Sequence, residues 1–147
     1  MYLELNREAA TKILTHPSVY PIVGDDNSMR AEDFSIPEMF KPLVCIALGG
    51  QPAACTIYHW RNCVTAEVHV SVLPEWRSAS YLAGRDMLTW LWTETPAEKL
   101  VGMIPTDNRQ ALLYTLRLGF KIEGICSKSF LRNGQLLDQT MIGLERK

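Results

Sequence analysis

The segment from Asn108 to Gly124, NRQALLYTLRLGFKIEG, predicts a short helix that ends sharply and continues into a strand. Thr106 or Asp107 can cap the start of this helix, because Asp107 and Gln110 have the three-residue spacing of a capping box. Gly119 stands where a residue with left-handed backbone geometry would close the last turn. The apolar residues of the helix recur three and four positions apart and are Leu112, Leu113 and Leu116.

The composition is that of one globular domain. The chain has 147 residues, of which 47% are hydrophobic and 21% are charged, so it is long enough to bury a core of its own. The formal net charge of -1 lacks the basic excess that nucleic-acid binders carry, and we expect no nucleic-acid partner. No repeat, linker or low-complexity stretch divides the chain, so a single domain over residues 1–147 is expected.

The cysteines and the apolar segments bear on the cellular compartment. None of the four cysteines forms a Cys-x-x-Cys pair and three lie in strand-like stretches, so buried thiols in a reducing compartment are expected. No apolar run has membrane-spanning length, and the first residues lack the basic and apolar regions of a signal peptide. We therefore expect a cytoplasmic protein with no membrane partner. The cysteines are Cys45, Cys55, Cys63 and Cys126.

The rest of the pattern predicts the order helix, irregular segment, three strands, helix, strand, helix, two strands. Residues 18–42 are rich in proline and turn residues and are expected as loops or a short helix over the sheet. Strand 65–73, a long helix to about Glu94 and strand 99–104 form one crossover unit with a parallel component. Asn133-Gly134 predicts a hairpin between the last two strands. The other expected elements are a helix over 4–15, opened near Asn6, and strands over 43–48, 53–60, 120–131 and 135–145.

Side chains that could carry chemistry alternate along the third strand. Glu67 and His69 lie two residues apart, so both point to the same face and could share one task. Histidine ordinarily titrates near pH 6.5, which suits proton transfer at neutral pH. The same alternation also fits a strand whose polar face simply contacts water. The opposite face is formed by Val68, Val70 and Val72, and Ser71 continues the polar one.

Asn108 and Ala111, followed eight residues later by Gly119-Phe120, resemble the signature of the GNAT superfamily of acyl-CoA N-acyltransferases. The element order resembles that family along almost the whole chain, most weakly before Leu43. The resemblance implies an α/β (α+β) fold with a mixed central sheet of about six or seven strands, flanking helices and a C-terminal β-hairpin. It also implies acetyl-CoA as cofactor, held where two central strands separate, and direct transfer of the acetyl group to a primary amine.

The resemblance implies a cofactor site at the start of the long helix, where backbone N–H groups hold the diphosphate. Arg77 matches the family pattern, whereas Ser80 and Leu82 stand where the family has glycine or alanine. Ser78 or Ser80 is also expected to cap the helix. Asn108 corresponds to the residue that binds the pantetheine arm, and its side chain could also cap the helix that follows. The implied binding residues are Arg77, Ser78, Ala79, Ser80, Tyr81, Leu82 and Asn108, with backbone N–H groups of Val70 to Val72 polarising the thioester.

The resemblance implies Glu67 or His69 as the proton acceptor and a tyrosine as the proton donor. Many members place that tyrosine at the position of Thr115, and here Tyr114 lies one residue earlier. Ribosomal-protein N-terminal acetyltransferases also lack it, and the chain looks most like that branch. No metal site is expected, because the histidines lack the spacing of metal ligands.

The acceptor remains open at this stage between a protein N-terminus, a lysine, a polyamine and a drug. An amine-bearing small molecule or protein is thus the expected partner, and the family makes a homodimer through the last strands plausible.

A second resemblance is to small GNAT-like proteins of tailed bacteriophages, some of which are associated with head assembly. It is carried by several short motifs. This implies an alternative: a catalytically degenerate assembly factor or chaperone that binds a phage virion protein, in the host cytoplasm. The motifs are Thr15-His16-Pro17, Asp25-Asp26, Glu67-x-His69, Pro74-x-x-Arg77, Ile104-Pro105-x-x-Asn108 and Gly119-Phe120.

Overall fold

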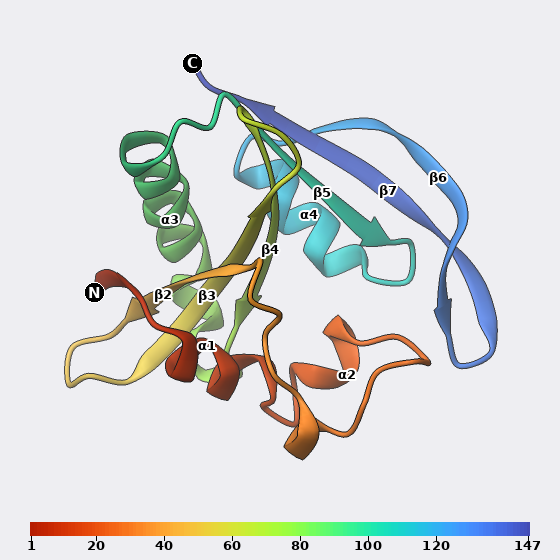
Figure 1. The fold of residues 1–147 in the computed structure, drawn as a ribbon, viewed down its shortest axis with the longest axis horizontal. Helices are drawn as coiled ribbons and strands as arrows, with labels where there is room; N and C mark the ends of the chain where they lie inside the picture. The colour runs from red at the N-terminus through yellow and green to blue at the C-terminus, as the bar shows by residue number, and fades with distance from the viewer.

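Seven strands form one mixed sheet in the computed structural model, which describes residues 1–147 (Figure 1). The strand order is β1-β2-β3-β4-β5-β7-β6, and every neighbouring pair is antiparallel except the parallel pair β4–β5. This arrangement confirms the expected mixed sheet and its C-terminal hairpin. The strands are β1 Tyr2–Leu5, β2 Lys41–Ile46, β3 Pro52–Trp60, β4 Thr65–Val72, β5 Lys99–Pro105, β6 Lys121–Arg132 and β7 Gln135–Glu145.

Helices cover both faces of the sheet, because neighbouring residues of a strand point to opposite sides. On β2, Val44 packs in a core with α1, whereas Leu43 packs in a core with α3. A third core lies between α3, β5 and β7 and contains Leu91, Leu100 and Ile142. None of the helices has the length and apolar character of a membrane span. The helices are α1 Arg7–Leu14, α2 Tyr20–Val23, η1 Ala31–Asp33, η2 Pro74–Ala79, α3 Ser80–Glu94 and α4 Arg109–Arg117.

The N-terminus differs from the expectation of a helix from Glu4. The first residues form β1, which pairs with β2 at the edge of the sheet, and α1 begins only at Arg7. The predicted opening near Asn6 is confirmed, since its Oδ1 accepts a hydrogen bond from the Ala9 N–H at 2.9 Å. A strand of four residues is too short to show a clear alternation, and its partner lies about forty residues away along the chain.

The helix caps correct two further expectations. Asn108, and not Thr106 or Asp107, caps α4, with its Oδ1 accepting from the Ala111 N–H at 3.2 Å. Neither Ser78 nor Ser80 caps α3: Ala79 holds that position without a side-chain hydrogen bond, because η2 runs directly into α3.

The end of α4 follows the expected pattern. Gly119 has φ +99°, which confirms the left-handed residue predicted there. Hairpin β6–β7 likewise turns at Asn133-Gly134, with φ values of +51° and +73°. After these turns, β7 pairs with β5 and β6 lies at the edge of the sheet.

Candidate active site

The parallel strands β4 and β5 stay paired for only three residues. Their register runs from Thr65–Lys99 to Glu67–Val101 and then stops, although β4 continues to Val72 and β5 to Pro105. Figure 1 shows the two strands side by side at one end and apart at the other. The inner edge of β4 beyond Glu67 therefore faces a gap in the middle of the sheet.

Backbone N–H groups of β4 point into this gap. In an antiparallel pair, the residues bonded to the neighbouring strand alternate along the chain. The Leu73 N–H donates to the Ala53 carbonyl at 3.0 Å, so the odd-numbered residues of β4 are those that bond to β3. The N–H groups of Val70 and Val72 consequently face the opposite edge, on the side that β5 has left.

A cavity of about 680 Å³ occupies the gap and reaches both faces of the sheet. On one face it is lined by side chains of α3 and α4, among them Met87, Asn108 and Tyr114. On the other it is lined by the segment around α2, including Val19 and Phe40. A long ligand could therefore enter from the α3–α4 side and meet a second molecule at the α2 side.

Glu67 lies at the point where the strands part, and its carboxylate is surrounded by Arg61 and two histidines. Its carboxylate accepts a hydrogen bond from Arg61 Nε at 2.6 Å, and His69 Nε2 lies 3.3 Å from its other oxygen. His59 Nε2, across the strand pair, lies 3.4 Å away. The hydrogen bond from His69 lowers the pKa of Glu67 from 4.5 to about 2; burial opposes this, and Arg61 reinforces it. Glu67 is thus a weak proton acceptor that orients His69.

Replacing Glu67 by glutamine should reduce the pH dependence of stability in acid. Because the folded-state pKa lies below the ordinary value, the carboxylate stabilises the fold above pH 4.5 and loses that contribution as the pH falls toward 2. At pH 7 we expect Glu67→Gln to lower the free energy of unfolding by about 2 to 3 kcal/mol. Urea titrations across pH would show the difference between the two proteins shrinking below pH 4.5. The control is Glu8→Gln, whose side chain is 83% exposed; a constant difference across pH would contradict the assignment.

The stretch expected to hold the diphosphate is helical throughout. Ser78 and Ala79 belong to η2, and Ser80 opens α3. Arg77 lines the cavity. Tyr81 lies under the Arg117 guanidinium, 5.4 Å from ring centroid to Cζ, and the residue Leu82 is 52% exposed. Neither bulky residue therefore fills the gap between β4 and β5.

Tyr114 and Asn108 both line the cavity from α4. The Tyr114 hydroxyl donates to the Ser80 carbonyl at 2.8 Å, and burial raises its pKa to about 12, so it stays protonated at neutral pH. Its ring lies against Gly84, where an added Cβ would come within 2.2 Å of the hydroxyl oxygen. Asn108 uses its side-chain oxygen as the α4 cap, which leaves its amide group for other contacts.

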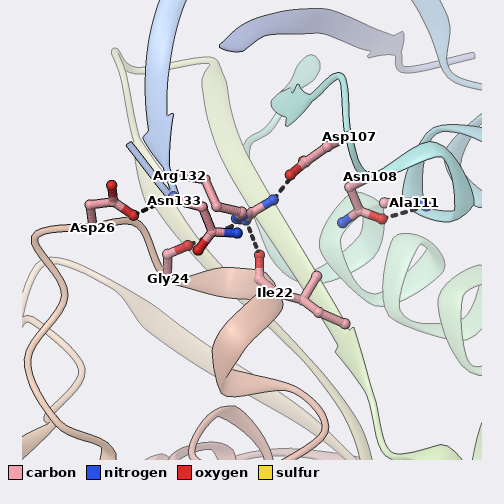
Figure 2. Close-up of polar contacts among 8 residues, drawn as sticks. All are labelled: Ile22, Gly24, Asp26, Asp107, Asn108, Ala111, Arg132 and Asn133. Atoms are coloured by element: carbon pink, nitrogen blue, oxygen red, sulfur yellow. Dashed lines mark hydrogen bonds and ion pairs between the residues drawn. The ribbon is translucent and has the colours of Figure 1, made fainter. Parts of the chain in front are cut away.

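The α2 segment is fastened to the rest of the site by a group that we call the Arg132 cluster: Arg132, Asp107, Asp26 and the carbonyls of Ile22 and Gly24. Arg132 Nη1 lies 2.5 Å from Asp107 Oδ1, and Nη2 donates to the Ile22 carbonyl at 2.6 Å. Figure 2 shows this guanidinium between the end of α2 and the residue that precedes Asn108. Asp26 accepts from the N–H groups of Asn133 and Gly134, each at 2.7 Å.

Several residues of the site were not anticipated from the sequence. Arg61 and His59 bind Glu67, and the Phe40 ring meets the His59 ring edge-on at a centroid distance of 4.7 Å. The β3–β4 register pairs His59 with Glu67, so aligning these two strands in the sequence would have predicted the contact between His59 and Glu67. His59, Glu67 and His69 also bring their ligand atoms within 4.8 Å of one another, which the linear spacing of the histidines did not suggest.

Comparison with known proteins shows the fold alone. No family model matches the sequence, and no curated protein matches it. Solved structures do: spermidine N-acetyltransferase from Vibrio cholerae, in complex with CoA and spermine, has a TM-score of 0.79 at 13% identity, covering 98% of this chain and 94% of that one. A variant of the same enzyme has a TM-score of 0.81 at 12% identity, over 99% and 95% of the chains.

A protein provisionally assigned as a phosphinothricin N-acetyltransferase has a TM-score of 0.76 at 18% identity, over 99% of this chain and 98% of that one. The chain thus has the GNAT N-acetyltransferase fold. These structures give no support to the ribosomal-protein branch in particular, nor to a phage origin.

Proposed function

We propose that the protein is an acetyl-CoA-dependent N-acetyltransferase that transfers the acetyl group directly to a primary amine. The observation that carries this proposal is the gap between β4 and β5, with the N–H groups of Val70 and Val72 directed into a cavity of about 680 Å³. Preorganised donors of this kind stabilise the negative charge that develops on a carbonyl oxygen during acyl transfer.

The residues around the gap suit the cofactor. Acetyl-CoA, when bound, supplies an acetyl group activated as a thioester. Val70 and Val72 would donate to its carbonyl oxygen, and the free amide of Asn108 would donate to the pantetheine arm. Arg77 and the uncapped first turn of α3 offer positive charge to the diphosphate.

Proton transfer is assigned to residues on opposite faces of the sheet. A C–N bond forms between the amine and the acetyl carbon while the C–S bond breaks, and the amine must lose a proton. We assign His69 as the proton acceptor, because Glu67 is too acidic for that role and instead holds the imidazole in place. Tyr114, which keeps its proton at neutral pH, lies on the α3–α4 side and is the candidate donor to the departing thiolate.

Calorimetric titration with acetyl-CoA tests the proposal. We expect binding in the micromolar range, weakened at least fivefold by Asn108→Ser. Serine keeps an oxygen for the α4 cap but has no amide, so stability should stay near that of the unaltered protein, whereas Asn108→Ala should lose about 1 kcal/mol of stability as well. Failure to bind at millimolar acetyl-CoA would exclude the enzyme.

A binding protein that has lost transfer is the second candidate, in the form of a phage assembly factor or chaperone. The observation that favours it is η2: residues 74–79 form a 3₁₀ helix, and the Ser80 N–H after it donates to the Arg77 carbonyl, so this N–H is not free for a diphosphate. It predicts no acetyl-CoA binding with an otherwise stable fold, so the same titration separates the two functions.

A further inference from the structure

We infer that the acceptor is an amine with a single positive charge and an apolar body, and not a polyamine. This inference rests on the proposed N-acetyltransferase function and names the substrate class of the same cavity.

The charges that line the cavity are unfavourable for a polycation. Glu67 is the only carboxylate among the lining residues, and the other charged side chains are Arg61 and Arg77. Arg61 already neutralises Glu67 through its bond to that carboxylate. An acceptor with two or more ammonium groups would therefore place at least one of them against apolar atoms or another cation, which is costly without a partner.

The wall on the α2 side is formed mainly by apolar side chains, with Ser18 as a polar exception. The Phe40 ring lies edge-on to the His69 ring at a centroid distance of 6.0 Å, so carbon surface begins beside the assigned proton acceptor. Phe34 continues the wall. At the rim, the residues Ile22 and Val23 are 46% and 43% exposed although they line the cavity. This surface suits a hydrocarbon group attached to the amine.

The orientation of the acceptor follows from this arrangement. Its amino group would lie between His69 and the gap at Val70, and its apolar body would extend along Phe40 toward Val23. The cavity has one carboxylate, Glu67, which is already paired with Arg61, so a single amine nitrogen can lie at the reacting end. No further carboxylate is present to pair with a second ammonium group.

Two amines of equal length separate the alternatives. We would titrate n-hexylamine and 1,6-diaminohexane into isotope-labelled protein without cofactor and follow the amide signals of Phe40 and His69. We expect the dissociation constant of n-hexylamine to be at least tenfold lower than that of 1,6-diaminohexane. Spermidine should bind more weakly than either amine. Binding of the diamine or of spermidine that is as tight as that of n-hexylamine, or tighter, would overturn the inference. No detectable binding of n-hexylamine at roughly 50 mM would also overturn it, since this concentration corresponds to a very weak affinity.

A matched pair of variants localises the effect. Val23→Asp places a carboxylate at the rim and should bring the two dissociation constants within about threefold of each other. Leu48→Asp places the same group at a site that is 90% exposed and outside the cavity, and should leave the ratio unchanged. These titrations need no acetyl-CoA. A lack of selectivity for n-hexylamine over the diamine would therefore refute only this inference, whereas a failure to bind acetyl-CoA would refute the proposed acetyltransferase function.

Discussion

Replacing His69 by alanine should lower kcat for acetyl transfer to n-hexylamine by about 100-fold or more, because the amine then loses its proton to water alone. Release of the CoA thiol gives the rate. The His69 side chain is 40% exposed and lines the cavity, so added imidazole can enter the space left by the substitution and should restore part of the activity. Restoration would show that proton transfer, and not folding, was lost.

His59→Gln is the matched control for this experiment. His59 also lies within 3.4 Å of Glu67, but its side chain is only 17% exposed and does not line the cavity. Its replacement should keep kcat within a fewfold of the unaltered protein. If His59→Gln and His69→Ala lower kcat equally, both histidines serve the fold and the assignment of His69 as proton acceptor is wrong.

Replacing Arg132 by methionine should lower the free energy of unfolding by roughly 3 kcal/mol. The Arg132 side chain is 14% exposed and bonds to the carboxylate of Asp107 and the carbonyls of Ile22 and Gly24, so its loss leaves several polar groups without their partner. Methionine keeps most of the apolar stem, which confines the change to the charged end. Urea unfolding measures the loss.

The effect of Arg132→Met should also be local. Amide hydrogen exchange in residues 18–40 should accelerate more than exchange in α3, because the Arg132 cluster fastens this segment to the hairpin. Arg30→Met is the control, since the Arg30 side chain is 76% exposed and pairs only with Glu32 and Asp33. Equal small losses from both arginines would show that the Arg132 cluster does not hold residues 18–40 against the hairpin.

The sequence predicted those parts of the fold whose signals are local. Asn133-Gly134 and Gly119 both required left-handed backbone, and each stands where the chain turns or ends a helix. The alternation of Glu67, His69 and the valines predicted the strand β4, which borders the cavity of the candidate site. These features depend on steric preference and periodicity within a few residues, so the local sequence is enough to predict them.

The parts that were missed depend on contacts between distant segments. Arg132 bonds to Ile22 from 110 positions away, and no local pattern indicates such a pairing. Arg61 carries no local signal of a site residue, yet it follows β3 and bonds back onto Glu67, where it reinforces the lowering of the pKa that the hydrogen bond from His69 mainly causes. Our proposal of His69 over Glu67 as the proton acceptor therefore depends on contacts between distant segments.

The central claim is that backbone N–H groups in the gap between β4 and β5 bind the thioester, and amide NMR tests it most directly. Titration with acetyl-CoA should shift the amide signals of Val70 and Val72 by more than that of Ser71, whose N–H bonds to β3, while Gly50 in the β2–β3 turn should stay unchanged. Saturable binding that leaves Val70 and Val72 unshifted would contradict the account.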